Sequence, residues 1–372
     1  MNAPLRILQA NSRFQGGGTD NQTLELCLGL RDLGDEVVLA VPEGCRLLPL
    51  AQERGLRLET FPLKSWLRLA MIRRLKQIIR AWRPHVLHVH QGRDYWPAIL
   101  AAWLAFRGTR VVVTRHLMTR PRAVSRWMLL RCAQVVAVSK AVLEVQQREL
   151  RGPAARLHQV YGGIDSAKFQ PARSEAMLSF RRAQGWEEKH TVFGVVGACD
   201  LPRGKGQLEF VAAAAQLRAE FPDARYAVVG DGTLKPQLRE RIAALSMDDI
   251  VRLVPFTNDI VTVLGALDVL AHPAVGTEAL GLVLWEAMAS GKPVVASRLD
   301  GIPEAFVEGE HGFLVPPGDA GALAAAMKRL LLDPELRRRF GAAGREWVCR
   351  SFSRETQARR MRELYLKLCE PR

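Results

Sequence analysis

The chain has 372 residues, with 53 Lys and Arg against 38 Asp and Glu, so its net charge is +15. Hydrophobic residues make up 48% and charged residues 24%, which indicates a soluble globular protein of about two ordinary domains. That balance excludes a disordered, collagenous or disulfide-dense chain. An excess of +15 is typical of proteins with a polyanionic partner, which can be nucleic acid, an anionic membrane or a phosphorylated substrate.

The excess positive charge lies in the first half of the chain. Residues 1–170 contain 26 Lys and Arg against 12 Asp and Glu, a net of +14, whereas residues 171–372 contain 27 against 26, a net of +1. Between Asp94 and Glu144 there are eight basic residues and no acidic one. Two halves with such different charge are expected to do different jobs.

The cysteines and the N-terminus limit the class of protein further. None of the six cysteines forms a CxxC pair, so we expect neither a zinc site nor a disulfide framework. The first residues lack the basic and then apolar pattern of a signal peptide. The longest uncharged apolar run, Tyr95–Phe106, is too short to span a bilayer. These features predict a cytoplasmic protein that can touch a membrane without crossing it.

Short apolar runs alternate with helix-length stretches along the whole chain. Helices are expected over Asn21–Leu33 and Ala70–Trp82. The expected strands are Arg6–Ala10, Glu36–Val41, Val86–His90, Arg110–Thr114, Gln134–Ser139, Thr191–Gly197, Arg225–Gly230, Ile250–Pro255, Asp268–Pro273 and Pro293–Ser297. Buried strands separated by helices predict two doubly wound α/β domains with parallel sheets. Such sheets bind ligands beyond the carboxyl ends of their strands, so we expect the site in a cleft between the domains.

The segment His272–Ser297 carries the most specific pattern. A strand ends at Pro273, a loop carries Glu278, and a helix begins near Gly281. Free N–H groups at the start of that helix form an anion site suited to a diphosphate. Carboxylates accept hydrogen bonds from sugar hydroxyls. Glu286 lies in the apolar segment LVLWEAMA, where a charged side chain is costly unless it binds a partner. A nucleotide-sugar fits these groups.

Glu278 and Glu286 reproduce the E-x7-E motif of the retaining GT-B glycosyltransferases of family 4 (GT4). The match continues through EAMASGKPVVAS, through Gly301–Asp319, and upstream through YAVVGDGT at Tyr226–Thr233. VVTRH, QVVAVS and QGGGTDNQTLELCLGLRDLGDEV also have counterparts, so the resemblance covers essentially the whole chain and extends to lipopolysaccharide core glycosyltransferases. It implies a GT-B fold of two Rossmann-like domains facing a central cleft. Residues 1–170 would bind the acceptor, residues 171–350 the nucleotide-sugar, and a C-terminal helix, 351–372, would return to the first domain.

The resemblance also implies a donor site. Glu286 would hold the ribose hydroxyls and Glu278 the donor sugar, while Arg203 and Lys205 would offset the charge of the diphosphate. Main-chain N–H groups would come from the loop that opens the helix, at Leu280, Gly281 and Leu282. The family usually has Gly-Phe-Gly after the first glutamate, whereas this chain has Ala279-Leu280-Gly281. Residues 254–258 would read the base.

Two groups in the first half complete the implied site. Gly17 and Gly18 belong to a glycine triplet before a helix, where the main chain can approach the diphosphate or the acceptor. His116 follows a strand at its carboxyl end, and the family places a functional histidine in such text, near the reacting sugar. A lone histidine is more often structural. His88 and His90 share a strand face and are interpreted as partly structural, and Asp20 is a further candidate near the acceptor.

The implied reaction moves a sugar from a nucleotide-sugar donor to a lipid-linked or glycan acceptor, with retention at the anomeric carbon. It would involve His116, Glu278, Arg203 and Lys205, and it would serve lipopolysaccharide or other cell-envelope polysaccharide synthesis. No Asp-x-Asp occurs in the chain, so no metal and no cofactor beyond the nucleotide-sugar co-substrate are expected. The alternatives are a GT-B nucleotide-sugar epimerase and a transferase with a soluble acceptor. A nucleic-acid-binding protein is a remote alternative, because the chain has no helix-turn-helix, RNP or zinc-finger text.

The basic first half is interpreted as a surface for an anionic membrane. The segment Arg115–Arg131 combines five arginines with a tryptophan and several aliphatic residues, as interfacial segments do. The residues expected to face the membrane are Arg120, Arg122, Arg126, Trp127 and Arg131. A second basic stretch covers Lys64–Arg83. The alternative is a partly buried helix with a solvated basic face. The protein is therefore expected at the inner face of the cytoplasmic membrane, as a peripheral protein.

Overall fold

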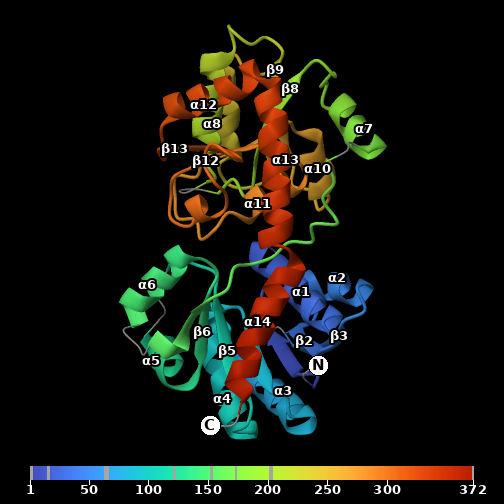
Figure 1. The fold of residues 1–372 in the computed structure, drawn as a ribbon, viewed down its shortest axis with the longest axis vertical. Coiled ribbons are helices and arrows are strands. Elements are labelled where there is room, and N and C mark those ends of the chain that lie inside the picture. The colour runs from blue at the N-terminus through green and yellow to red at the C-terminus, as the bar shows by residue number, and fades with distance from the viewer. Residues whose placement is uncertain are drawn as a thin grey trace. The chain divides into compact units, whose positions relative to one another are not determined.

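The computed structural model describes residues 3–14, 17–62, 67–119, 123–150, 154–171, 174–200 and 204–370. The chain divides into two units (Figure 1). The first comprises Met1–Ile164 and Phe352–Arg372, and the second comprises Asp165–Ser351. The sequence of the first unit holds 31 Lys and Arg against 14 Asp and Glu, a net of +17, and that of the second holds 22 against 24, a net of −2. The C-terminal segment thus adds to the charge of the basic unit.

The first unit is built on a seven-stranded parallel sheet with the order β3-β2-β1-β4-β5-β6-β7. Its strands are β1 (Arg6–Ala10), β2 (Glu36–Pro42), β3 (Arg57–Phe61), β4 (Val86–Val89), β5 (Arg110–Arg115), β6 (Gln134–Ala137) and β7 (Leu157–Gln159). Its helices are α1 (Gly18–Asp32), α2 (Leu47–Glu53), α3 (Leu67–Trp82), α4 (Tyr95–Ala105), α5 (Ala123–Cys132), α6 (Lys140–Leu150) and α14 (Arg354–Cys369), with short 3-10 turns at Gly92–Asp94 and Ala154–Arg156.

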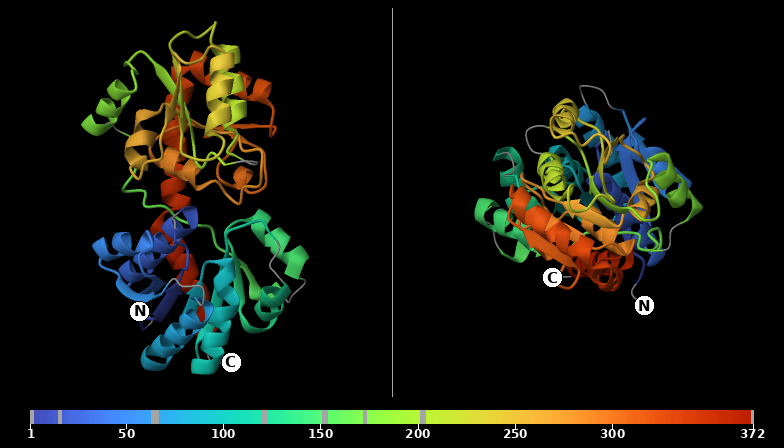
Figure 2. Two further views of the ribbon diagram at one scale, coloured as in Figure 1. Left: turned by 180° about the vertical axis from the view of Figure 1, so that it is seen from behind. Right: turned by 90° about the horizontal axis from the view of Figure 1, so that it is seen from above.

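Helices cover both faces of this sheet (Figures 1 and 2). Alternate strand residues point to opposite faces, so Leu8 packs with α3, α4 and α5, whereas its neighbour Ile7 packs with α1, α2 and α14. Both faces are apolar, which explains why the strands read as uninterrupted runs of Val, Leu and Ile. The two cores bury the interior strands on both faces, whereas the edge strands β3 and β7 are only partly buried.

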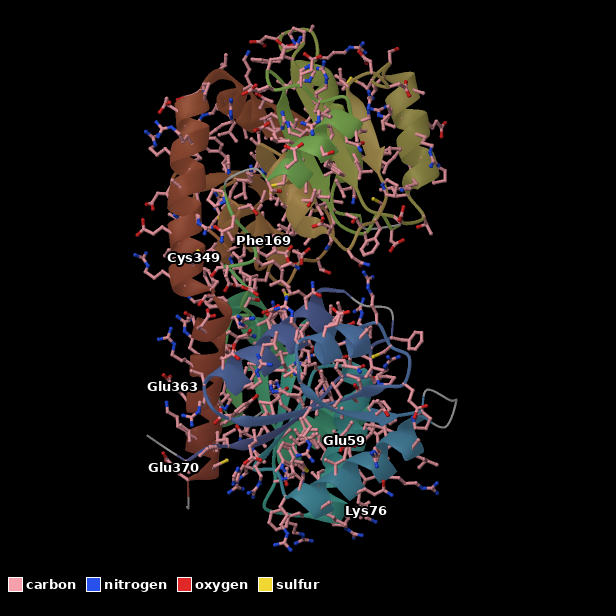
Figure 3. All side chains as sticks on the ribbon, turned by 90° about the vertical axis from the view of Figure 1, so that its right-hand side faces the viewer. Glu59, Lys76, Phe169, Cys349, Glu363 and Glu370 are labelled. Atoms are coloured by element: carbon pink, nitrogen blue, oxygen red, sulfur yellow. The ribbon has the colours of Figure 1, made fainter. Side chains whose placement is uncertain are left out.

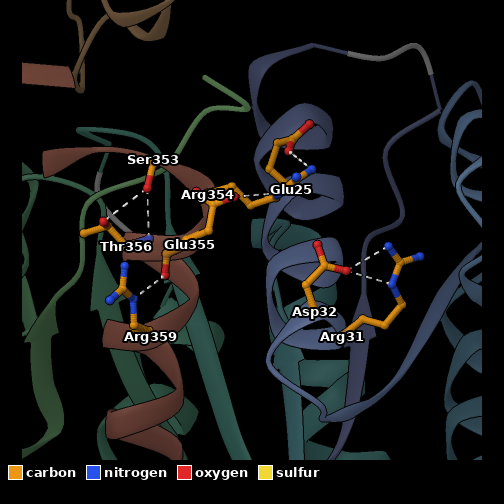
Figure 4. Close-up of polar contacts among 8 residues, drawn as sticks. All are labelled: Glu25, Arg31, Asp32, Ser353, Arg354, Glu355, Thr356 and Arg359. Carbon is orange, nitrogen blue, oxygen red and sulfur yellow. Dashed lines mark hydrogen bonds and ion pairs between the residues drawn. The ribbon is translucent and has the colours of Figure 1, made fainter. Parts of the chain in front are cut away.

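The C-terminal helix α14 is anchored to α1 and to the start of β2 by ion pairs. Arg354 pairs with Glu25 at 3.2 Å, and the fully buried Asp35 accepts two hydrogen bonds from Nε of Arg362, both at 3.0 Å (Figure 4 shows the Arg354 pair). Ser353 caps the helix by accepting from the Thr356 N–H. Glu363 and Glu370 lie on the outward side of the helix (Figure 3).

The second unit repeats the design with a six-stranded parallel sheet in the order β10-β9-β8-β11-β12-β13. Its strands are β8 (Thr191–Val196), β9 (Ala224–Val229), β10 (Val251–Val254), β11 (Val269–His272), β12 (Val294–Ser297) and β13 (Gly312–Val315). Its helices are α7 (Glu175–Ala183), α8 (Gln207–Leu217), α9 (Lys235–Ala244), α10 (Ile260–Ala266), α11 (Leu282–Ala289), α12 (Ala320–Leu332) and α13 (Pro334–Ser351), with a 3-10 turn at Ile302–Glu304. Arg345 of α13 donates to the carbonyl of Phe169, which Figure 3 labels.

The structure confirms all ten predicted strands, with bounds that differ by at most two residues. It also confirms the prediction of two doubly wound α/β units, because each sheet reverses its strand order once, at β1/β4 and at β8/β11. The chain leaves the first unit at 164 rather than at 170 and re-enters it at 352. Across the described ranges, no helix has both the length and the apolar composition needed to cross a membrane.

Candidate active site

The E-x7-E segment lies where strand β11 ends and helix α11 begins. Gly281 caps α11 with a left-handed main chain (φ 77°), which a residue without a side chain adopts at no steric cost. Leu282 is the first residue of the helix, so its N–H and that of Val283 have no partner within the helix, whereas the Leu284 N–H donates to the Gly281 carbonyl at 2.9 Å. Leu280 is buried, whereas Glu278 and Glu286 are half-buried. The residues predicted to bind a diphosphate and a sugar therefore lie at the carboxyl edge of the second sheet.

Glu278 is held by two basic side chains. Its Oε2 lies 2.5 Å from Nζ of Lys205 and 3.4 Å from Nε2 of His272. Its main chain is fixed as well, because its N–H donates to Asp300 at 3.1 Å and its carbonyl accepts from the Gly301 N–H at 3.1 Å. Only 15% of the Glu278 side chain is exposed. The carboxylate is thus oriented before any ligand arrives.

The two bases also keep Glu278 ionised. Burial by itself raises the pKa of this carboxyl, but the hydrogen bond and charge of His272 and the ammonium of Lys205 outweigh it and hold the pKa well below its usual range. A carboxylate that stays ionised only accepts hydrogen bonds. Sugar hydroxyls and cations are therefore the groups that it can bind.

A close main-chain approach places Lys205 beside Glu278. Gly206 has a left-handed main chain (φ 77°), and a Cβ at this position would lie 1.8 Å from the Pro273 carbonyl oxygen. Only glycine allows the loop before α8 to lie against the end of β11. Gln207 then fixes the loop, since its Oε1 accepts from the Lys205 N–H at 2.6 Å and its Nε2 donates to Ala198. The predicted partner Arg203 lies outside the described residues.

The region predicted to read a base follows β10, at the same edge of the second sheet. The Phe256 N–H donates to Asp231 at 2.9 Å, and the Phe256 side chain is 54% exposed. Asp231 follows β9, so the loops after β9 and β10 are joined by this hydrogen bond. An exposed aromatic side chain here offers a flat face for a base.

In the first unit, the loop after β1 and helix α1 place polar groups at the carboxyl edge of the sheet. Gly17 precedes α1 with a positive φ of 134°, and Gly18 is the first residue of the helix. Asp20 is 3% exposed, its Oδ1 accepts from Asn11 at 2.9 Å, and its Oδ2 is buried without a hydrogen-bond partner. Burial, partly offset by the Asn11 hydrogen bond and nearby arginines, raises the pKa of Asp20. A group that donates to Oδ2 would complete this site.

A second buried carboxylate lies close by, at the start of α4. Asp94 accepts hydrogen bonds from both the N–H and the hydroxyl of Ser12, and Arg93 donates to the same hydroxyl at 2.7 Å. Burial raises the pKa of Asp94 to about 6, against the lowering effect of Ser12 and of the Arg93 charge. Ser12 is thereby fixed from two sides.

His116 follows β5 as predicted and lies beside His90, with Nε2 of His116 3.4 Å from Nδ1 of His90.

The residues predicted to face a membrane lie on or just before α5. Trp127 is 59% exposed on α5, Arg131 lies over its ring at 5.4 Å, and Arg126 is half-buried. Arg120 and Arg122 lie outside the described residues. The exposed Trp127 is the kind of side chain that interfacial segments use.

Sequence reasoning missed four groups that shape these sites. His272, Gln207 and Asp300 hold Lys205 and Glu278, and Tyr365 reaches the histidines from α14. His272 and Gln207 adjoin residues that the motif identifies, which is the signal that could have found them. Asp300 has a positive φ of 45°, and such backbone in a residue other than glycine marks a constrained loop.

Three comparisons with known proteins agree with this architecture. Residues 178–347 match the family described as "Glycosyl transferases group 1", and residues 16–168 match "Glycosyltransferase Family 4". The phosphatidyl-myo-inositol mannosyltransferase of Mycolicibacterium smegmatis is 30% identical over 346 residues, which cover 90% of this chain and 86% of the relative.

Solved structures show the same fold. A glycosyltransferase from Rickettsia africae superposes with a TM-score of 0.88 at 20% identity, and the match covers 100% of both chains. The structure of Alr3699/HepE from Anabaena in complex with UDP-glucose has a TM-score of 0.85 at 22% identity, over 98% of this chain and 100% of that one. The two sheets and these neighbours define a GT-B fold. The chain belongs to the family 4 (group 1) glycosyltransferases.

Proposed function

We propose that this enzyme transfers a sugar from a nucleotide-sugar donor, with retention and without a metal, to a lipid-linked or glycan acceptor of the cell envelope. Lipopolysaccharide core is the acceptor class that the sequence signature suggests. The observation that carries the proposal is the cluster of Lys205, His272 and Glu278 beside the N-terminus of α11. Those groups supply a cation, a fixed carboxylate and free N–H groups at one sheet edge.

Each donor group has a partner in that cluster. The diphosphate takes Lys205 and Arg203 and the N–H groups of Leu280, Gly281 and Leu282, because helix N-termini and cations bind phosphate oxygens. Glu278 accepts hydrogen bonds from hydroxyls of the donor sugar, and Glu286 accepts them from the ribose. When a donor enters, the phosphate replaces Glu278 as the anion nearest Lys205, so the carboxylate becomes free to bind hydroxyls.

The proposed reaction breaks the bond between the anomeric carbon and a phosphate oxygen of the donor. A hydroxyl oxygen of the acceptor forms the new bond on the same face of the sugar, and its proton passes to the leaving phosphate. The products are a glycoside and a nucleoside diphosphate. Lys205 and Arg203 stabilise the charge that develops on the leaving group, which is the role that a metal has in other transferases.

The acceptor assignment rests on charge and on a relative. The first unit carries a net charge of +17, which suits an anionic surface or a phosphorylated acceptor. The mycobacterial relative is named for a phosphatidylinositol acceptor. A peripheral position at the inner face of the cytoplasmic membrane follows, with Arg126, Trp127 and Arg131 of α5 and the neighbouring Arg120 and Arg122 toward the lipid.

The donor site is tested by binding and by turnover. A panel of UDP-, GDP- and ADP-sugars should contain one donor that raises the melting temperature of the protein. Glu278→Ala and Lys205→Ala should each reduce transfer from that donor by at least about a hundredfold, as loss of a group that stabilises the transition state does. Lys328→Ala is the matched control, since Lys328 forms an ion pair with Glu220 at 2.7 Å on the surface of the same unit. Full activity in either site variant would rule out the donor assignment.

The acceptor, stereochemistry and metal requirement each have a direct readout. Release of nucleoside diphosphate should need a glycolipid or glycan acceptor, and turnover with the donor alone would point to an epimerase instead. Transfer to a soluble sugar but not to lipid-linked acceptors would favour the soluble-acceptor alternative. The anomeric proton coupling of the product should match that of the donor. Activity should persist in excess EDTA, and its loss with recovery on adding Mg²⁺ would contradict a metal-free mechanism.

A further inference from the structure

The interior of the first unit contains a continuous chain of polar side chains that the donor site does not use. It runs from His116 through His90 to Gln9 of β1, then to Tyr365 of α14, and on to His88 of β4, which also contacts Thr114 of β5. The successive distances between donor and acceptor atoms are 3.4, 2.8, 3.4, 2.5 and 2.6 Å. Gln9, His88 and Tyr365 are fully buried, and His90 and Thr114 are 4% exposed.

Each hydrogen bond in this chain fixes the direction of the next. Oε1 of Gln9 can only accept, so Nε2 of His90 carries a proton and donates to it. Nδ1 of the neutral His90 ring is then an acceptor, and Nε2 of His116 must donate to it. His116 is therefore protonated on Nε2, and its Nδ1 carries a lone pair.

The other half of the chain hydrogen-bonds in the matching direction when Gln9 has this orientation. Nε2 of Gln9 donates to the Tyr365 hydroxyl, whose single hydrogen is then left for Nδ1 of His88. Nε2 of His88 in turn donates to Oγ1 of Thr114. If the Gln9 amide were reversed, every hydrogen bond would reverse with it, and the proton on His116 would move to Nδ1. Tyr365 is thus linked, through these hydrogen bonds, to the tautomer of His116.

The histidines are neutral, as the scheme requires. Burial, together with the charges of Arg115 and Arg13, lowers the pKa of His116 to about 3. Burial, with the nearby His116, lowers the pKa of His88 to about 3, and burial with both other rings lowers that of His90 well below its usual value. Within the part of the chain that the structure describes, the hydrogen bond of the His116 ring is made through Nε2 and leaves Nδ1 without a partner. It remains available to a ligand.

We propose that Tyr365, Gln9 and His90 are positioning residues that hold His116 in a single tautomer, so that its Nδ1 accepts a hydrogen bond from a hydroxyl group of the substrate. A neutral ring protonated on Nε2 can bind a hydroxyl but cannot protonate one through Nδ1. The role assigned to His116 rests on the proposed transferase function, whereas its tautomer does not. The C-terminal helix contributes to the site through Tyr365, which explains a hydroxyl at that buried position.

Nuclear magnetic resonance of the full-length chain with ¹⁵N-labelled histidine tests the tautomer directly. Two-bond ¹H–¹⁵N correlations distinguish a protonated ring nitrogen from an unprotonated one, and His116→Gln identifies the His116 signals. We expect a proton on Nε2 and none on Nδ1. A proton on Nδ1 of His116 in the unaltered protein would overturn the proposal, and this result does not depend on the folding of Tyr365→Phe.

The variant Tyr365→Phe tests the positioning role, because it removes the hydroxyl and retains the ring. The hydrogen bonds that couple the Gln9 amide to His88 are then lost, so the His116 signals should show a mixture of tautomers. In the transferase assay kcat should fall by about tenfold or more, while KM for the donor stays within about twofold. Tyr95→Phe is the matched control, since it also removes a buried hydroxyl of the first unit. That hydroxyl donates to the main-chain carbonyl of Thr114, which takes no part in the hydrogen bonds between His116 and His88.

The outcomes separate this inference from the proposed function. An unchanged His116 tautomer in Tyr365→Phe, or an equal loss of kcat in Tyr95→Phe, would contradict the positioning role. The expected tautomers in a protein that transfers no sugar from any donor would instead contradict the transferase assignment alone. A mixture in Tyr365→Phe together with a selective loss of kcat supports both.

Discussion

Nζ of Lys205 and Oε2 of Glu278 lie 2.5 Å apart, although 73 positions separate the two residues in the chain. The contact depends on Gly206, which lets the loop before α8 lie against Pro273 at the end of β11. In the absence of a donor each residue satisfies the charge of the other. In the proposed donor site, a bound diphosphate would take over Lys205 and release Glu278 to accept hydrogen bonds from hydroxyls.

The ion pair predicts an acid-dependent loss of stability. The pKa of Glu278 in the folded protein lies below its usual value, because His272 and Lys205 outweigh burial. The carboxylate therefore contributes stability that is fully present above about pH 4.5 and is lost as the pH falls toward the pKa of the folded state. Between pH 6 and pH 3.5, the free energy of unfolding measured with urea should fall less in Glu278→Gln than in the unaltered protein. Glu220→Gln, at a surface pair, is the control, and parallel curves for all three proteins would contradict the prediction.

Asp94 predicts a stability that falls as the pH rises, opposite to the effect of Glu278, over a neighbouring pH range. Burial raises the pKa of this carboxyl to about 6, whereas the unfolded chain ionises near 3.8. Between these values the folded state binds more protons, so its stability should fall as the pH rises from about 4 to about 6. The difference of two pKa units corresponds to at most about 3 kcal/mol.

Asp94→Asn isolates this effect, because the amide oxygen can still accept from the Ser12 N–H. Relative to the variant, the unaltered protein should lose stability over that range and run parallel to it above about pH 7. Urea unfolding at half-unit pH intervals measures the difference. A constant difference between the two proteins from pH 4 to pH 7 would show that Asp94 titrates at its ordinary pKa in the folded state.

The anchor between α14 and the first sheet predicts a large effect of a single arginine. Asp35 is fully buried and accepts two hydrogen bonds from Arg362. Among the described residues, Arg362→Ala leaves that carboxylate with only the Leu5 N–H, and we expect it to reduce the free energy of unfolding by about 3 kcal/mol. Arg359→Ala, on the exposed side of the same helix, should change it by less than about 0.5 kcal/mol. Equal effects of the two changes in urea denaturation would count against the anchor.

The sequence predicted every interior strand and one edge strand, β10, and missed the other three edge strands. All three unpredicted strands, β3, β7 and β13, are edge strands. An edge strand has one neighbour and is partly solvated, so it needs no long apolar run, as RLETF of β3 shows. The unbroken runs of Val and Leu that identified β1 or β8 reflect burial on two faces.

The site was predictable where its residues belong to recognisable local motifs, such as those around Lys205 and Glu278. Glu278, Gly281 and Glu286 form one contiguous motif, and their placement around the start of α11 follows from it. Tyr365 lies 277 positions from its partner His88, and no local pattern connects the two. Contacts of that kind arise from tertiary packing, which periodicity and motif spacing do not encode.

The exposed Trp127 predicts how the first unit meets a membrane. Trp127 lies on α5, which follows the carboxyl edge of the sheet, and Arg131 stacks on its ring at 5.4 Å. A tryptophan beside arginines suits the headgroup region of an anionic bilayer. The protein should sediment with phosphatidylglycerol vesicles but not with phosphatidylcholine vesicles, and less as the salt concentration rises. Trp127→Ala should weaken binding to anionic vesicles about tenfold, the effect of no longer burying one large apolar side chain.

Trp103 provides a matched control for this prediction. It is also 59% exposed, and Arg107 lies over its ring at 5.6 Å, but it is near the end of α4, at the amino edge of the sheet. Trp103→Ala should therefore leave vesicle binding unchanged if the membrane is met at the carboxyl edge, where the candidate acceptor groups lie. Loss of binding in Trp103→Ala with none in Trp127→Ala would place the lipid contact at the opposite edge. Equal sedimentation with both vesicle types would leave the charge of +17 without a role in membrane binding.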